Sequence, residues 1–283
     1  MVWERRKLTP SFGMELSGQS LKPGLPLSEM KAVYDAVVEH GVVVVKGQDL
    51  SDADYANFAG SIGQIVPLPM IDNLEQAPVS LFGNVDREGD FQADDSVSMS
   101  GHRTALVWHI DNSYLRPRAS LSMLYGLVIP PFGSNTEFCD LRLAYEALPP
   151  EEQKRLEGLT ARHWLIRTLL NGGMKISPDY ETRFPPVHRP LVHTHPESGR
   201  KVLCIAFHVA GIEGMADEDA QAMVAELTEW ATVPERVYSH KWSPGDLVIW
   251  DNRSVMHRAT PYDIHQHKRD VRGLRLNDLA DAA

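Results

Sequence analysis

Three residues stand out because their side chains could bind one metal ion together: His109, Asp111 and His257. The first two lie two positions apart in VWHIDNSY, so on an extended strand both side chains point to the same face. The third lies far downstream, in GDLVIWDNRSVMHRATPYD. Two histidines and one carboxylate form the facial triad of non-haem iron(II) sites, which leaves coordination positions for a 2-oxo acid and for O₂. These residues therefore predict an oxygen-activating iron site.

Other interpretations fit the same three side chains. A single His-x-Asp pair is usually a surface or hydrogen-bonded histidine, a zinc hydrolase could use the same ligands, and a non-catalytic binding module could retain them. Trp108 and Trp250 flank the two halves of the predicted site, and both halves have apolar neighbours. Polar side chains in such surroundings need a partner, which favours a metal.

Five longer segments add to this pattern: WHIDNSY, GSNTEFCDLRLAYEALP, HRPLVHTHPESGRKVL, WSPGDLVIWDNRSVMHRATPYD and KRDVRG. Together and in this order they resemble the taurine and 2,4-dichlorophenoxyacetate dioxygenase family (TauD/TfdA), most closely its 2,4-dichlorophenoxyacetate branch. The resemblance implies a mixed α/β fold, with a double-stranded β-helix (a cupin-like jelly roll) as its core and helices packed outside and in inserts.

The resemblance also implies an activity, that of an Fe(II)- and 2-oxoglutarate-dependent dioxygenase. Such an enzyme uses O₂ to hydroxylate a C–H bond of a small organic molecule and releases succinate and CO₂. The branch suggests an aryloxyalkanoate or a related acid, whose ether bond breaks after hydroxylation. A binding module or a zinc hydrolase would not need a 2-oxoglutarate anchor.

By resemblance, His109, Asp111 and His257 are the iron ligands. Thr136 and Arg269 fall on the residues that bind the distal carboxylate of 2-oxoglutarate. A guanidinium suits that role because it binds a carboxylate through two parallel hydrogen bonds. An alignment without a gap would place Lys268 there instead, with Arg272 four residues later.

The predicted substrate site departs from the family pattern. Relatives that bind sulfonates or aryloxyacetates carry an arginine where this chain has Gly273, and the segment QIVPLPMIDN lacks an expected lysine. Asn84 corresponds to a position near the substrate, and Arg103 is a candidate for the replacement cation. The other cations available for that role are His102, Arg116, Arg118 and Arg275.

Hydrophobic periodicity predicts the elements that must position these residues. We expect helices over 28–40, 51–63, 142–148, 150–156 and 217–231. We expect strands over 42–47, 105–110, 119–128, 202–209 and 247–250, and a hairpin joining 191–194 to 202–205. Ser28 is the expected N-cap of the first helix, and Ser51 with Asp54 forms a capping box for the second.

The chain is predicted to form one domain over residues 1–283. Its parts are an N-terminal helix–strand–helix region (1–84), a loop (86–100) and the jelly-roll core (105–278). The loop is acidic, polar and without periodicity. Because it precedes the first iron ligands, we expect a mobile lid that excludes water from the site.

Composition restricts the partners. The 283 residues carry a formal net charge of −10, which argues against nucleic acid or an anionic membrane as a partner. No apolar run approaches the length of a membrane span, and the first ten residues lack the apolar core of a secretory signal. Two cysteines exclude a disulfide framework and favour the cytoplasm. A small-molecule substrate is the expected partner, and a homo-oligomer is left open.

Overall fold

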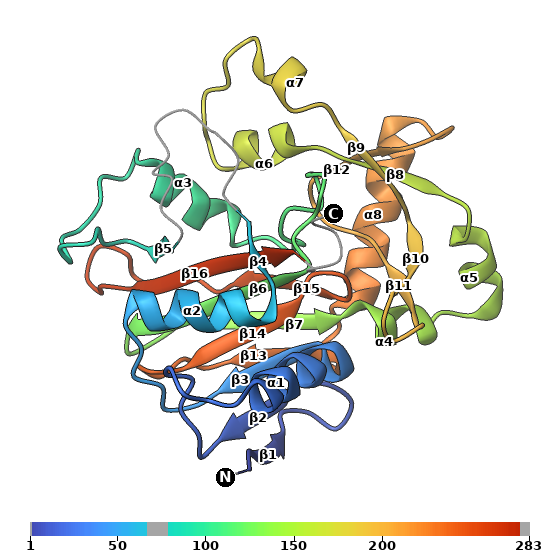
Figure 1. The fold of residues 1–283 in the computed structure, drawn as a ribbon. Helices are drawn as coiled ribbons and strands as arrows, with labels where there is room; N and C mark the ends of the chain where they lie inside the picture. Colours follow the sequence, from blue (N-terminus) through green and yellow to red (C-terminus); the bar gives the residue numbers. More distant parts are fainter. Residues whose placement is uncertain (1, 67–78, 278–283) are drawn as a thin grey trace.

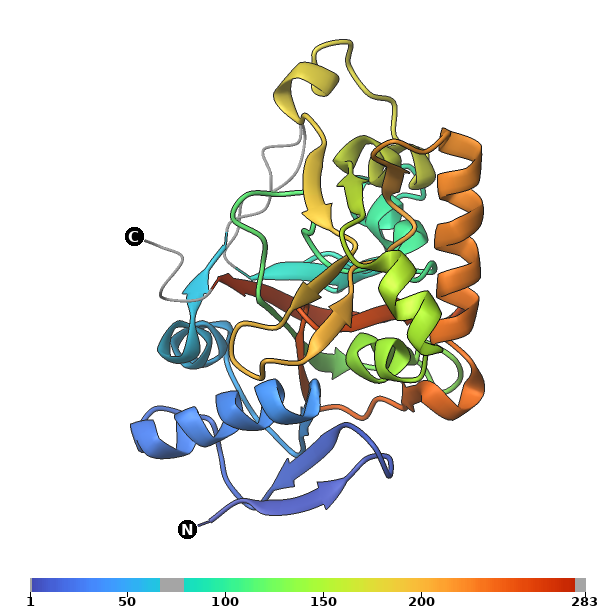
Figure 2. The same cartoon turned by 90° about the vertical axis from the view of Figure 1, so that its right-hand side faces the viewer.

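The computed structural model describes residues 2–66 and 79–277. It is a mixed α/β structure in which two β-sheets pack face to face and helices cover their outer sides (Figures 1 and 2). The larger sheet has the strand order β1-β2-β3-β14-β6-β16-β4, with β5 paired to β16. Its strands are β1 (Glu4–Lys7), β2 (Met14–Ser17), β3 (Val42–Val45), β4 (Gln64–Ile65), β5 (Ser80–Gly83), β6 (Leu121–Val128), β14 (Leu247–Asp251) and β16 (Asp270–Asn277).

The smaller sheet has the order β13-β7-β15 and packs on the inner face of the larger one. Its strands are β13 (Val237–His240), β7 (Thr136–Asp140) and β15 (Val255–Ala259). Side chains alternate across each strand, so Phe138 and Val255 meet Val248 and Trp250 of β14 in the space between the sheets. This sandwich, which is antiparallel apart from the β2–β3 pair, contains the predicted jelly-roll core.

Two helices cover the outer face of the larger sheet, α1 (Leu27–His40) and α2 (Asp52–Ile62). The predicted capping box of α2 is present, because Ser51 accepts from the Asp54 amide and the Asp54 side chain accepts from the Ser51 amide. The first helix differs from its prediction. It begins at Leu27, with Pro26 rather than Ser28 at the N-cap and no side-chain cap.

The inserts form a second layer on the far side of the smaller sheet (Figure 2). They comprise α4 (Leu141–Glu146), α5 (Pro150–Leu156), α6 (Leu165–Asn171), α7 (Tyr180–Arg183), α8 (Asp217–Ala231), a 3₁₀ turn (Pro234–Arg236), a sheet of β12 (Val209–Ile212), β8 (Thr160–His163) and β9 (Val187–Pro190), and the hairpin of β10 (Val192–Thr194) and β11 (Lys201–Leu203). The hairpin was expected from the sequence.

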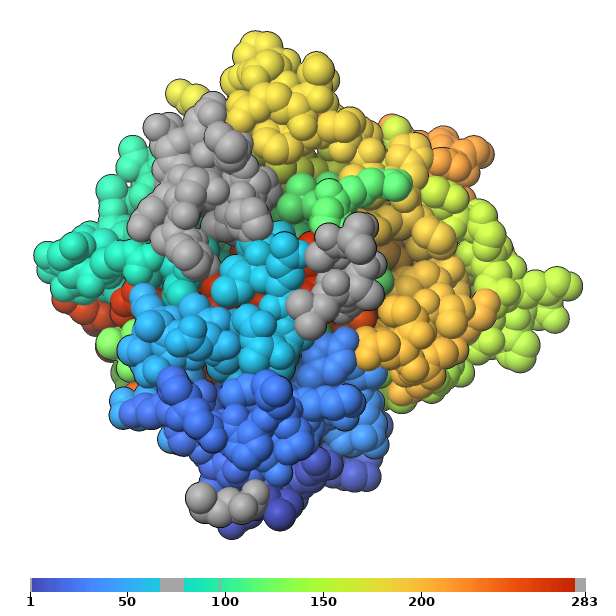
Figure 3. Space-filling model, in the orientation of Figure 1, coloured from blue at the N-terminus to red at the C-terminus, as the bar shows by residue number. Residues whose placement is uncertain are grey.

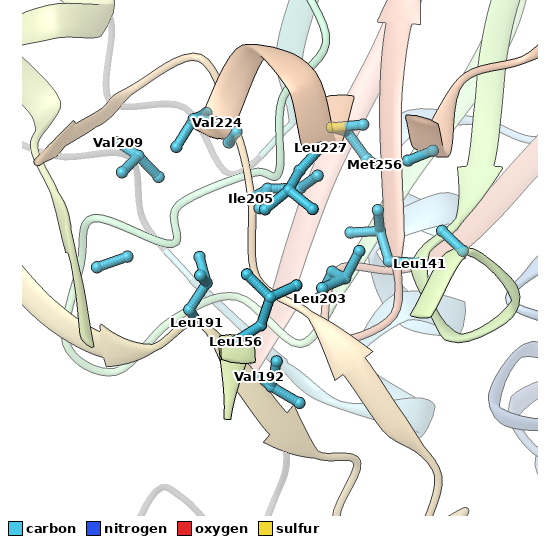
Figure 4. Packing of buried hydrophobic residues seen from close by; sticks show 14 of the residues in the cluster. Leu141, Leu156, Leu191, Val192, Leu203, Ile205, Val209, Val224, Leu227 and Met256 are labelled. Carbon is cyan, nitrogen blue, oxygen red and sulfur yellow. The ribbon is translucent and has the colours of Figure 1, made fainter. Parts of the chain in front are cut away.

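A buried cluster fixes α8 to this layer. Leu227 of the helix lies next to Ile205, and Met256 of β15 belongs to the same cluster (Figure 4). Trp108 and Ile110 also point into it. The residues that alternate with these two, His109 and Asp111, must therefore point to the opposite side.

Three secondary-structure predictions were wrong in whole or in part. The segment 105–110 forms no regular strand, and only His109 pairs, in an isolated bridge to His257. The expected loop over 86–100 ends early, because α3 (Val97–Thr104) begins within it and Ser96 caps the helix through the Met99 amide. The strand expected over 202–209 is divided between β11 and β12.

Within the described ranges, no helix is both long and apolar enough to cross a membrane.

Candidate metal centre

The two histidines of the predicted triad are directly opposite each other. The His109 amide donates to the His257 carbonyl and the His257 amide donates to the His109 carbonyl, both at 2.9 Å. This backbone pair sets the ring centroids 4.1 Å apart. Asp111 follows two residues after His109, and its carboxylate oxygens lie 3.8 Å from Nε2 of each histidine. One ligand atom from each residue fits within a group no wider than 4.8 Å.

Hydrogen bonds orient these groups. The Nδ1 atom of His109 lies 2.7 Å from the Val107 carbonyl, so it carries the proton and leaves the Nε2 lone pair facing Asp111. Ser122 donates to Asp111 Oδ2 at 2.7 Å, and the Asn252 amide donates to the Ser122 hydroxyl at 2.8 Å. The Trp250 indole in turn donates to Asn252 Oδ1. A buried relay therefore holds the carboxylate in place.

The protonation states suit a cation. Burial lowers the pKa of both His109 and His257, which keeps the imidazoles neutral. Burial alone would raise the pKa of Asp111, but Arg275, the two histidines and the Ser122 hydrogen bond together hold it well below its ordinary value. Two neutral imidazoles and one carboxylate, all buried or nearly so, are a donor set that fits iron(II).

The triad faces a cavity of about 840 Å³. Thr136 and Arg269, the two residues that the resemblance linked to 2-oxoglutarate, both line it. The Thr136 hydroxyl accepts from the Trp242 indole at 3.0 Å, so its own proton stays available to an acceptor. Arg269 is only 6% exposed, and burial lowers its pKa to about 10.

Arg269 has no carboxylate partner among the described residues. Its guanidinium donates to the Phe82 carbonyl at 3.0 Å, and burying a charge without a counter-ion is costly. The alternative residue, Lys268, lies outside the cavity lining, where it donates to the Gly89 carbonyl at 2.5 Å. Arg272 also points away, because it pairs with Asp270. The gapped alignment assigns the cosubstrate role to Arg269, and among these three residues Arg269 is the one that lines the cavity.

The position of the Phe82 ring explains why residue 273 is a glycine. A Cβ atom placed on Gly273 would lie 2.3 Å from Cε2 of Phe82, so the phenyl ring occupies the space of a side chain at this position. Two residues further along the same face of β16, Arg275 lines the cavity. Its guanidinium lies 5.1 Å from the Phe82 ring and donates to Asp111 at 3.4 Å. The buried Nε atom of Arg275 has no hydrogen-bond partner in the described structure.

The remaining predicted substrate residues lie elsewhere. Asn84 donates to the Ile264 and His267 carbonyls and accepts from the Arg269 amide, so it fixes the start of β16 rather than facing the cavity. Arg103 is outside the lining and donates to the Gly172 and Asp94 carbonyls. The stretch 64–73, where a lysine was expected, extends beyond the described residues from position 67.

His102 does line the cavity, but it is a poor candidate for a cation. Burial, with Arg269 nearby, lowers its pKa to about 4, so it is neutral at pH 7. No pattern in the sequence points to Phe82, Ser122 or Asn252, since their roles depend on contacts between segments that are distant in the chain.

Residues 4–275 match the family described as "Taurine catabolism dioxygenase TauD, TfdA family". The chain belongs to this family, and it is therefore an Fe(II)- and 2-oxoglutarate-dependent dioxygenase that acts on a small organic molecule with O₂.

Two curated relatives narrow the comparison. The chain is 37% identical to the alpha-ketoglutarate-dependent 2,4-dichlorophenoxyacetate dioxygenase of Cupriavidus pinatubonensis, over 96% of both chains. It is 33% identical to the (S)-phenoxypropionate/alpha-ketoglutarate-dioxygenase of Sphingobium herbicidovorans, over 92% of this chain and 90% of that one.

A solved structure agrees with the fold over nearly the whole chain. AAD-2 in complex with Mn(II) and N-oxalylglycine superposes with a TM-score of 0.88 at 33% identity, and the match covers 99% of this chain and 98% of that one. The expected family, jelly-roll fold, cofactors and enzyme class are confirmed.

Proposed function

We propose that His109, Asp111 and His257 hold the iron, and that Thr136 and Arg269 bind the distal carboxylate of 2-oxoglutarate. The observation that carries this assignment is the buried guanidinium of Arg269, which lines the same cavity as the triad and has no carboxylate partner in the described structure. A dicarboxylate that reaches from the metal to Arg269 would supply the missing counter-ion.

The protein's own groups orient the reactants. The Ser122–Asn252–Trp250 relay holds Asp111, and the backbone bridge holds the two histidines. When bound, iron(II) and 2-oxoglutarate supply the oxidising chemistry that activates O₂. Thr136 and Arg269 fix the cosubstrate at one end, so that the substrate's C–H bond must approach from the remaining part of the cavity.

The substrate proposed here is a small aromatic acid of the aryloxyalkanoate type. Leu165, Leu169 and Met174 line the cavity and offer apolar surface to an aromatic ring, as Phe82 does. Arg275 offers the cation that Gly273 lacks, with an unpartnered Nε to receive a carboxylate. The acids on which the two relatives act, by their names, have this chemistry.

We also propose that the segment 86–100, which ends within the first turn of α3, acts as a mobile lid. Asp86, Glu88 and Phe91 line the cavity, and the Phe91 side chain is 47% exposed. Covering the substrate with this segment would exclude water and bury that ring. Hydrogen exchange tests the lid: substrate should slow exchange over 86–100 in the loaded enzyme, and unchanged exchange would contradict the proposal.

The cytoplasm is the proposed location, because Cys139 and Cys204 are both free and buried, as suits a reducing compartment. The oligomeric state is a separate question, and size-exclusion chromatography with light scattering would show whether the protein forms a homo-oligomer.

One spectroscopic experiment tests the metal and cosubstrate roles. Iron(II) and 2-oxoglutarate added without oxygen should give the weak visible charge-transfer band of a chelate, and Thr136→Val should shift the titration to higher 2-oxoglutarate. A zinc hydrolase or a binding module would give no band, and that result would overturn the assignment.

The substrate class needs a separate test. Succinate release above the uncoupled background should rise with aryloxyalkanoates and less with neutral aryl ethers. Arg275→Gln should lower kcat/KM for the acids about tenfold, since it removes a charged hydrogen bond. Arg272→Gln is the matched control, because it lies on the same strand but faces away from the cavity. If Arg275→Gln lowers kcat/KM equally for the acids and for the neutral ethers, Arg275 does not recognise the substrate's carboxylate, and the proposal of an anionic substrate fails.

A further inference from the structure

A second cavity, of about 520 Å³, lies outside the metal centre. Its lining includes three arginines and one histidine, Arg116, Arg118, Arg189 and His193, which we call the arginine cluster. The arginines come from the segment that follows Asp111 and from β9, and the histidine from β10. In Figure 3 that segment, in green, lies against the yellow and amber parts of the chain that carry these strands.

The arginine cluster lacks a counter-ion. The remaining lining residues are Pro117, Pro190, Thr194 and Cys204, so no carboxylate faces this cavity from the described chain. Arg189 is partly buried, and burial together with Arg118 and Arg116 lowers its pKa to about 10. Burial, and then Arg118, lowers the pKa of His193 to about 4, so the histidine adds no charge at pH 7.

The three guanidiniums are not equally engaged. Arg189 donates to the Ser113 and Leu115 carbonyls at 2.5 and 2.6 Å, and Arg116 donates to the His188 carbonyl at 3.2 Å. Arg118 is half-buried and has neither a hydrogen bond nor an ion pair with any described residue. Like charges gathered without a counter-ion repel one another, and an anion would relieve that repulsion.

We propose that the arginine cluster binds a phosphate or sulfate group, either as the free ion or carried on a small organic molecule. A tetrahedral dianion can accept hydrogen bonds from several guanidiniums at once. The cavity is larger than such a group requires, so it leaves space for an organic part beside Thr194 and the two prolines. This site is independent of the roles proposed for Arg269 and Arg275.

Thermal unfolding of the enzyme loaded with Mn(II) and 2-oxoglutarate tests this site. Sulfate should raise the unfolding temperature relative to chloride at equal ionic strength, because a ligand that binds the folded state stabilises it. Arg118→Gln should weaken the apparent sulfate affinity about tenfold, as expected for loss of a charged hydrogen bond. Glycerol 3-phosphate tests the organic form: a response at lower concentration than sulfate would support a phosphate ester, and an equal response the free ion.

Two controls separate this site from the metal centre and from general salt effects. Arg5→Gln removes an exposed arginine of β1 and should leave the response to sulfate unchanged. Arg275→Gln alters the metal-centre cavity and should also leave it unchanged, so failure of the substrate proposal would not affect this result.

Two results would overturn the proposal. The first is an equal sulfate response in the wild type and in Arg118→Gln, and the second is no response in either.

Discussion

The two ends of the main cavity are built differently. At the metal end, each group is held by a neighbour: the histidines by a backbone bridge, and Asp111 by Ser122 and Asn252. The substrate end is lined by Phe82, by the segment before α3 with the exposed ring of Phe91, and by Arg275. One guanidinium nitrogen of Arg275 reaches back to Asp111, while its Nε has no hydrogen-bond partner in the described structure. The metal ligands are therefore held in position before any reactant binds. The groups that would contact a substrate still have an unpartnered donor and an exposed apolar surface.

The largest effect is expected at the metal end. Asp111→Ala removes the only carboxylate of the triad, so turnover should fall below detection and iron binding should weaken strongly. Succinate release and an iron titration would measure both. Full activity in this variant would show that the triad is assigned wrongly.

A strong but smaller effect is expected where the cosubstrate is held. Arg269→Ala should raise the 2-oxoglutarate requirement, since losing one partner of a buried charge pair costs about 2–5 kcal/mol. Lys268→Ala is the matched control and should leave the requirement unchanged, because Lys268 lies outside the cavity. The reverse pattern would favour the ungapped alignment.

The relay behind Asp111 should have an intermediate effect. Ser122→Ala should weaken metal binding by about 10–100-fold, the usual range for groups that orient a ligand. Ser120→Ala is a suitable control, since its hydroxyl donates to the Leu276 carbonyl and not to the carboxylate. Equal metal affinities in the two variants would mean that Asp111 needs no support from this side.

The smallest effect concerns Gly273 at the substrate end. Gly273→Ala should lower the free energy of unfolding by about 1–3 kcal/mol, because its Cβ would overlap the Phe82 ring. In a Phe82→Ala background, the same Gly273→Ala substitution should cost much less. Gly60→Ala is the control, because its Cβ would enter open space and should not destabilise the protein. Denaturant unfolding measures each change. For the same steric reason, Gly273→Arg alone should not raise activity on aryloxyacetates.

Local patterns in the sequence were sufficient to predict several helices. The structure places α5 and α8 at the predicted residues, and the predicted capping box starts α2. Each of these depends on neighbours within a few turns of chain. The jelly-roll fold was predicted from the resemblance of five longer segments to the family. The same resemblance assigned the iron ligands, which lie far apart in the chain.

Other features depend on contacts that no local pattern carries. The helix α3 lies in a polar stretch, and it is held by Ser100, which donates to the carbonyl of Gly172 at the end of α6. His109 resembled a strand residue, yet it pairs only with His257. The Phe82 ring of β5 packs where a side chain at position 273 of β16 would lie, and these two strands are distant in sequence. From the sequence alone, the glycine therefore indicated only that a cation is missing, and not that another side chain fills its space.

The isolated bridge between His109 and His257 has a consequence for the stability of the apoprotein. In the described structure, few backbone hydrogen bonds join the segment 105–112 to β15: the reciprocal pair between His109 and His257, and one from the Ala259 amide to the Ala105 carbonyl. A metal ion held by His109, Asp111 and His257 would act there as a cross-link that closes a long loop of the chain. It would favour the folded state partly by restricting the unfolded one, as a disulfide does in the chain-entropy account. Chelation should therefore expose residues 105–112 to proteolysis before the sandwich itself opens.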